Sequence, residues 1–186
     1  MSRLVDRGAR TAGWVGLGMA ATIWVSFLLV IPIEAVYWYS TLPAGLLIGY
    51  YANARSERAG GPWLRLASNA VYAGLVTGVT FAVLFLLTKA LFFNLDEGYR
   101  DASMGGPLAC QKGADCAYQR YAASEQGPAM AAAGITDTAT FSAFYWNQQL
   151  TVSGMQLGFS VGGALFAGLM FGAVNRRRPE GSVPAA

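Results

Sequence analysis

The stretch LASNAVYAGLVTGVTFAVLFLLTKALFF, residues 66–93, decides the fold of this chain. Its only charged residue is Lys89, near the end of the stretch. An α-helix rises about 1.5 Å per residue, so about 20 apolar residues cross a hydrocarbon core about 30 Å thick. The stretch therefore predicts a membrane-spanning helix.

Three further apolar runs occupy residues 14–33, 36–52 and 152–174. The run at 36–52 is the shortest and contains Pro43, which the preceding turn or a neighbouring helix must accommodate. We still count it as a span, because the arginines that follow it must return to the side of the N-terminal arginines. The run at 14–33 could instead be a signal peptide, but its apolar core is too long and no cleavage site follows it. The sequence thus predicts an all-α integral membrane protein with four transmembrane helices.

The distribution of basic residues predicts which way these helices face. Nine of the 13 Lys and Arg residues lie at the N-terminus, between the second and third runs, or after the fourth run: Arg3, Arg7, Arg10, Arg55, Arg58, Arg65, Arg176, Arg177 and Arg178. Cytoplasmic loops carry the excess of Lys and Arg, so both termini are expected in the cytoplasm and the loop between the third and fourth runs outside it. The net charge of +3 follows from this topology and gives no reason to expect nucleic-acid binding.

The chain is accordingly expected to have five segments. Residues 1–12 form a basic cytoplasmic N-terminus, 13–93 the first three transmembrane helices, 94–150 an extracytoplasmic cap, 151–175 the fourth helix and 176–186 a cytoplasmic tail. The Ala/Gly-rich composition and the preference for Arg over Lys are typical of a high-GC bacterium. The expected location is therefore the plasma (inner) membrane of a bacterium.

Glycines recur four residues apart in the later runs. The members of these pairs and ladders are Gly45, Gly49, Gly74, Gly78, Gly154, Gly158, Gly162, Gly168 and Gly172. Residues four apart share a helix face, and small residues there let two helix backbones approach closely, which drives helix association in lipid. These faces either hold the monomer together or contact another subunit. The best-placed sets for a contact with another subunit are Gly154/Gly158/Gly162 and Gly168/Gly172.

Two ionisable residues, Glu34 and Lys89, lie near the outer ends of predicted spans. Charged groups at membrane depth are rare and are candidates for function. Their opposite signs at similar depth predict an ion pair between helix ends, and a lysine can also extend its ammonium group to the headgroups. A role in handling protons or ions is the alternative.

The extracytoplasmic segment contains the only cysteines of the chain, Cys110 and Cys116. They are six positions apart on the side of the membrane that is oxidising. This spacing predicts a disulfide that closes a small loop.

Short helices are expected in the rest of that segment. An Ala-rich stretch has helix-forming composition, and Gly127 and Pro128 interrupt it. Gly134 is placed to end the second helix, and Thr136 or Asp137 to cap the next one. We therefore expect a disulfide-pinned helical cap.

Function must be inferred largely from what the sequence lacks. It has no histidine and no second cysteine pair, so we expect no metal site and no cofactor. It has no nucleophile–base–acid set and no phosphate-binding glycine loop, so we expect no enzyme. The leading hypothesis is a structural or accessory subunit, in contact with the bilayer, that packs through glycine-rich helix faces in a homo-oligomer or a larger membrane complex. A small oligomeric channel or transporter, with Glu34 and Lys89 near its pathway, is the alternative.

Overall fold

The computed structural model describes residues 5–30, 39–56, 61–95, 110 and 112–176. These residues form helices and contain no strand. In chain order the helices are α1 (Arg7–Val30), α3 (Thr41–Ala54), α4 (Trp63–Leu95), α5 (Ala114–Ala123), α6 (Gly127–Ala132) and α7 (Thr138–Arg176). The chain divides into two compact units, one of residues 1–84 with 153–186 and one of residues 85–152. We call the first the glycine unit, because glycines lie at its helix contacts, and the second the ring unit, because aromatic rings form its core.

Two of the helices, α4 and α7, are long and apolar enough to cross a membrane. Helix α1 has 24 residues, whereas α3 has only 14. At about 1.5 Å per residue, α3 is about 21 Å long and shorter than a hydrocarbon core. The first residues of the predicted second span, and Glu34 before it, lie outside the described residues. The protein is therefore all-helical with two helices able to cross a membrane, and the four-span topology stays a prediction.

Local sequence explains where several of the helices begin or end. Pro43 lies in the first turn of α3, where a missing N–H removes no helix hydrogen bond. Gly134, with φ of 76°, follows α6 in the left-handed conformation that glycine tolerates best. Asp137 then caps α7, because its Oδ1 accepts hydrogen bonds of 2.9 Å from the N–H groups of Ala139 and Thr140.

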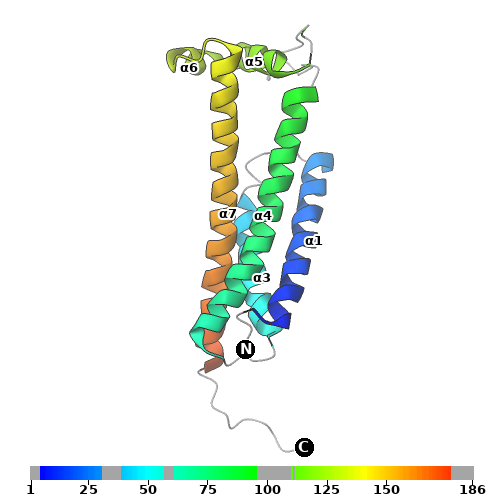
Figure 1. Cartoon of the computed structure of the whole chain (residues 1–186), viewed down its shortest axis with the longest axis vertical. Helices are drawn as coiled ribbons and strands as arrows, with labels where there is room; N and C mark the ends of the chain where they lie inside the picture. The colour runs from blue at the N-terminus through cyan, green and yellow to red at the C-terminus, as the bar shows by residue number, and fades with distance from the viewer. Residues whose placement is uncertain (1–4, 31–38, 57–60, 96–109, 111, 177–186) are drawn as a thin grey trace, which may run out of the picture. The chain divides into compact units, whose positions relative to one another are not determined.

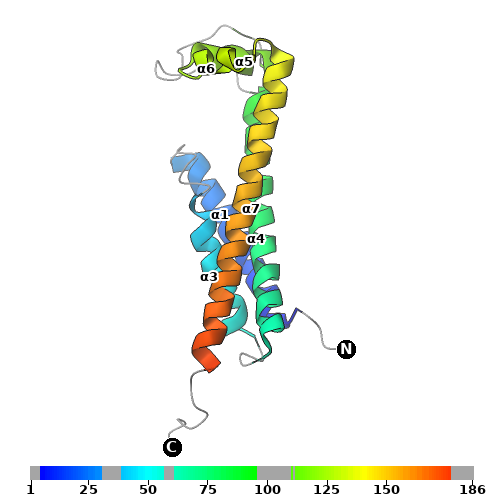
Figure 2. The same ribbon diagram turned by 90° about the vertical axis from the view of Figure 1, so that its left-hand side faces the viewer.

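The glycine unit consists of α1, α3, the first part of α4 and the last part of α7 (Figures 1 and 2). Helix α1 packs along α3, and small side chains dominate the buried cluster between α1, α3 and α4. The members of this cluster are Ala9, Ala12, Ile48, Ala52 and Ala73. The start of α1, the end of α3, the start of α4 and the end of α7 lie at the same end of the unit (Figure 1).

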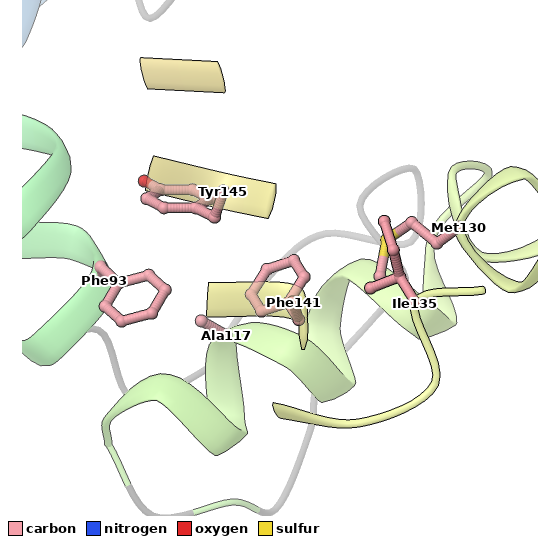
Figure 3. Close-up of a cluster of buried hydrophobic side chains, with 6 residues drawn as sticks. All are labelled: Phe93, Ala117, Met130, Ile135, Phe141 and Tyr145. Atoms are coloured by element: carbon pink, nitrogen blue, oxygen red, sulfur yellow. The ribbon is translucent and has the colours of Figure 1, made fainter. Parts of the chain in front are cut away.

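The ring unit is packed around aromatic side chains (Figure 3). Phe141 is completely buried, and the rings of Tyr121 and Phe93 lie 5.2 Å and 6.4 Å from it, centroid to centroid. The Tyr145 hydroxyl donates a hydrogen bond of 3.4 Å to the backbone carbonyl of Lys89. Rings contributed by α4, α5 and α7 therefore share one core.

The structure contains a disulfide between Cys110 and Cys116, whose Cα atoms are 5.2 Å apart. Cys116 lies in α5 and is buried. Helix α7 starts at Thr138 and continues without a break into the apolar run, so the predicted extracytoplasmic segment and the predicted fourth span share one helix.

Candidate functional site

The glycines of α3 bring its backbone against that of α7. A Cβ added to Gly45 would collide with the carbonyl oxygen of Ser160, and one added to Gly49 would collide with that of Ala164. The clashing atoms belong to the backbone and cannot rotate away. Close contact between these two helices therefore requires glycine at both positions.

The glycines of α4 allow the same close approach from a second side of α7. A Cβ added to Gly74 would lie 2.7 Å from the Cβ of Ala164, and one added to Gly78 would lie 3.0 Å from Leu157 Cδ1. The Ser160 hydroxyl donates a hydrogen bond of 3.0 Å to the Gly74 carbonyl, which ties the two helices together.

The two glycine sets proposed as sites for another subunit differ in their surroundings. A Cβ added to Gly168 would lie 2.6 Å from the Cβ of Ala70, and one added to Gly172 would lie 2.6 Å from Leu66 Cδ1. Both are buried against α4, within the chain itself. The set Gly168/Gly172 is thus occupied by the monomer.

The ladder Gly154, Gly158 and Gly162 faces outward. All three residues are exposed, and no described residue lies within 4 Å of a Cβ added at any of them. Two bulky apolar side chains beside the ladder, Met155 and Phe166, are 51% and 61% exposed. The ladder is therefore an exposed strip of small residues that no described residue covers.

Three further glycines pack closely, and two of them, Gly8 and Gly163, were not predicted from the sequence. A Cβ would collide with the Arg55 carbonyl oxygen at Gly8 and with the Thr77 hydroxyl at Gly16, and would lie 2.9 Å from the Leu42 carbonyl oxygen at Gly163. Alanine stands four residues after each of these glycines. Counting Gly-xxx-Ala pairs as well as Gly-xxx-Gly pairs would have found Gly8 and Gly163.

Most buried polar side chains of the glycine unit form hydrogen bonds, but two on α7 do not. Gln156 is 0% exposed, and neither atom of its amide has a hydrogen-bond partner among the described residues. The buried Ser153 hydroxyl also has no hydrogen-bond partner among the described residues. Gln156 lies one helical turn before Ser160, which packs against Gly45, so it is level with Thr41 at the start of α3. A buried amide without partners costs roughly 1–3 kcal/mol.

A polar network closes the end of the glycine unit that holds the start of α1. Asp6 accepts hydrogen bonds from the Ser56 hydroxyl, from the Asn69 amide at 2.9 Å and from the backbone N–H of Ala9 at 3.1 Å. Burial opposes ionisation of Asp6, but these hydrogen bonds and the charge of Arg65 outweigh it and lower the pKa of the carboxyl group. The network joins segments far apart in the sequence.

The predicted ion pair between Glu34 and Lys89 stays a prediction. Glu34 is outside the described residues, and the ammonium group of Lys89 lies 5.3 Å from the ring centroid of Phe85. In the described part of the chain, no three His, Cys, Asp or Glu side chains gather as they would around a metal ion. Comparison of the chain with protein-family models, with curated proteins and with solved structures finds no match.

Proposed function

We propose that this protein is a non-enzymatic, multi-pass membrane subunit that associates through the Gly154/Gly158/Gly162 ladder of α7. The partner is a second copy of the chain or a neighbouring subunit of a larger membrane complex. The observation that carries the proposal is the difference between the two sets on α7. One set is filled by the chain's own α4, and the other lies exposed with no described residue against it.

The physics of helix association in lipid supports this role for the ladder. Lipid tails are as apolar as leucine, so helices associate through close packing of backbones rather than through burial of apolar area. Three glycines in successive turns leave a groove, and the bulky side chains beside it form ridges that fit a similar groove. Two copies of the same face would therefore complement each other.

The proposal includes four spans with both termini in the cytoplasm. Nine basic residues at the N-terminus, between the second and third apolar runs and after the fourth run support this orientation. The disulfide between Cys110 and Cys116 supports an oxidising environment for the segment between α4 and α7. The proposed location is the plasma (inner) membrane.

Replacement of Gly158 tests the proposal. The Gly158→Leu variant fills the groove, so we expect it to shift the purified protein from oligomer to monomer at least about tenfold, a change of about 1.4 kcal/mol. Gly18→Leu is the matched control, because Gly18 on α1 is also exposed with no described residue nearby. Native mass spectrometry in mild detergent reports the oligomeric state and any protein that co-purifies. A wild-type protein that is monomeric and lacks a co-purifying partner would refute the proposal, as would equal effects of the two variants.

A second candidate function, a small oligomeric channel or transporter, is favoured by the buried polar atoms of Gln156 and Ser153. Such atoms are satisfied when water or a polar solute occupies the space beside them. Gln156→Leu would then abolish solute flux in liposomes while leaving the oligomer intact. If wild-type liposomes show no flux above empty ones, this candidate fails and the subunit proposal is unaffected.

A further inference from the structure

A shallow surface pocket of about 340 Å³ lies between the first turns of α1 and the last turn of α3. Its lining residues are Arg7, Gly8, Thr11, Tyr51 and Arg55. Two arginines therefore border one small space, together with a threonine whose hydroxyl donates a hydrogen bond of 3.1 Å to the Arg7 carbonyl, and a tyrosine. We propose that this pocket binds the phosphate group of an anionic phospholipid.

The two helices hold the pocket in place. The backbone of α1 at Gly8 contacts that of α3 at Arg55 so closely that a Cβ on Gly8 would collide with the Arg55 carbonyl oxygen. Arg55 is the residue that ends α3, and its guanidinium lies 5.7 Å from the ring centroid of Tyr51. Contact of an arginine with an aromatic face restricts the orientation of its planar donor group. The contact between the two helices thus fixes the backbone positions of Arg7 and Arg55 relative to each other.

The positive charge of the pocket has no carboxylate against it among the described residues. Asp6 is next to Arg7 in sequence, but its carboxylate is turned into the network with Ser56 and Asn69. The charge that lowers the pKa of Asp6 is that of Arg65, which does not line the pocket. Arg7 and Arg55 are both exposed. Their donors are therefore available to an anion, and a phosphate accepts hydrogen bonds from two such groups at once.

The surroundings of the pocket favour a phosphate on a lipid over a free one. This end of the glycine unit carries the exposed aromatic side chains of Trp14 and Trp63, which are 75% and 42% exposed. Exposed tryptophans of apolar helices collect at headgroup depth. Arg7, Thr11 and Trp14 lie on one face of α1, so acyl chains below a bound phosphate would run along apolar helix surface. This step rests on the membrane location argued under the proposed function.

Removing the two arginines tests the site. Wild-type protein in detergent is mixed with phosphatidylglycerol or with phosphatidylcholine, and native mass spectrometry counts the lipid that stays bound. Each of Arg7→Gln and Arg55→Gln should weaken retention of phosphatidylglycerol about fivefold, and the double variant about 25-fold, if each arginine contributes about 1 kcal/mol. Retention of phosphatidylcholine should not change. Arg10→Gln is the matched control, since Arg10 is an exposed arginine of the same helix that does not line the pocket.

Two results would overturn the inference. One is retention of phosphatidylglycerol by both single variants at the level of Arg10→Gln, and this comparison stands even if the double variant does not fold. The other is complete displacement of phosphatidylglycerol by millimolar inorganic phosphate, which would make the pocket a site for free anions. Neither result bears on the oligomer test of Gly158→Leu, so the two proposals fail separately.

Discussion

The glycine unit and the ring unit are packed by opposite kinds of side chain. In the glycine unit, helix backbones touch at Gly45 and Gly49, where not even a methyl group fits. In the ring unit, Phe141 is enclosed by other rings, and large apolar surfaces are buried. Both are helical, so the difference lies in what brings the helices together.

The two kinds of packing draw on different driving forces. Burying an aromatic ring releases it from water, and this driving force is absent where the surroundings are already apolar. Close backbone contact gains dispersion energy and hydrogen bonds such as that from Ser160 to Gly74, which lipid does not replace. Backbone contact and ring burial are therefore two different ways of holding helices together in one chain.

The most damaging change should be Gly49→Leu. Its side chain has no room between the backbones of α3 and α7, and Ala164, which it would strike, contributes backbone atoms there. We expect the glycine unit to lose its fold, with a collapse of the thermal transition in detergent and rapid proteolysis. Gly158→Leu, on the exposed face of α7, should melt like the wild type at a concentration where both are monomeric. If Gly49→Leu also melts like the wild type, backbone contact does not hold this unit together.

The ring unit should be destabilised when a side chain of its aromatic core is shortened. Phe141→Ala leaves a cavity in the ring cluster and should cost about 3–5 kcal/mol. Faster amide exchange in α5, measured by hydrogen–deuterium exchange, would report this loss. Phe144→Ala on the same helix is the control, because Phe144 is 39% exposed and is not part of the cluster. Equal exchange in the two variants would contradict an aromatic core.

The smallest effect is expected from the network around Asp6. Because the pKa of Asp6 is lowered in the folded protein, the carboxylate stabilises the fold above its ordinary pKa of about 3.9 and loses this effect as the pH falls through the lower folded value. For a partly exposed group the gain is about 1 kcal/mol or less. The melting temperature of the wild type should exceed that of Asp6→Asn at pH 7, and the difference between the two melting temperatures should narrow near pH 3. A difference in melting temperature that does not depend on pH would mean that the packing of the Asp6 side chain, and not its charge, stabilises the fold.

Local features of the fold could be predicted from the sequence. The apolar run at 66–93 lies within α4, Gly134 follows α6 with a positive φ, and Asp137 caps α7. Each of these depends on residues within one or two helical turns, so the chain near the feature contains the necessary information. The spacing of Cys110 and Cys116 is a signal of the same local kind.

Features that depend on distant segments could not be predicted. Gly172 and Gly158 have similar sequence surroundings, yet Gly172 packs against Leu66 and Trp63 of α4 whereas Gly158 has no described neighbour. Likewise, the hydrogen bond from Asn69 to Asp6 joins residues 63 positions apart. Periodicity shows that a helix has a small face, but which neighbour covers that face is decided by tertiary packing.

The exposed ladder on α7 and the buried glycines of α3 should be under different kinds of selection. Most replacements of Gly45 or Gly49 would be removed because the monomer could not fold. A Cβ at Gly154, Gly158 or Gly162 meets no described atom within 4 Å, so under the proposed function we expect selection at these positions to reflect what docks there. A library that saturates these three positions would therefore record the shape of the partner, and the tolerated residues would outline its contact surface.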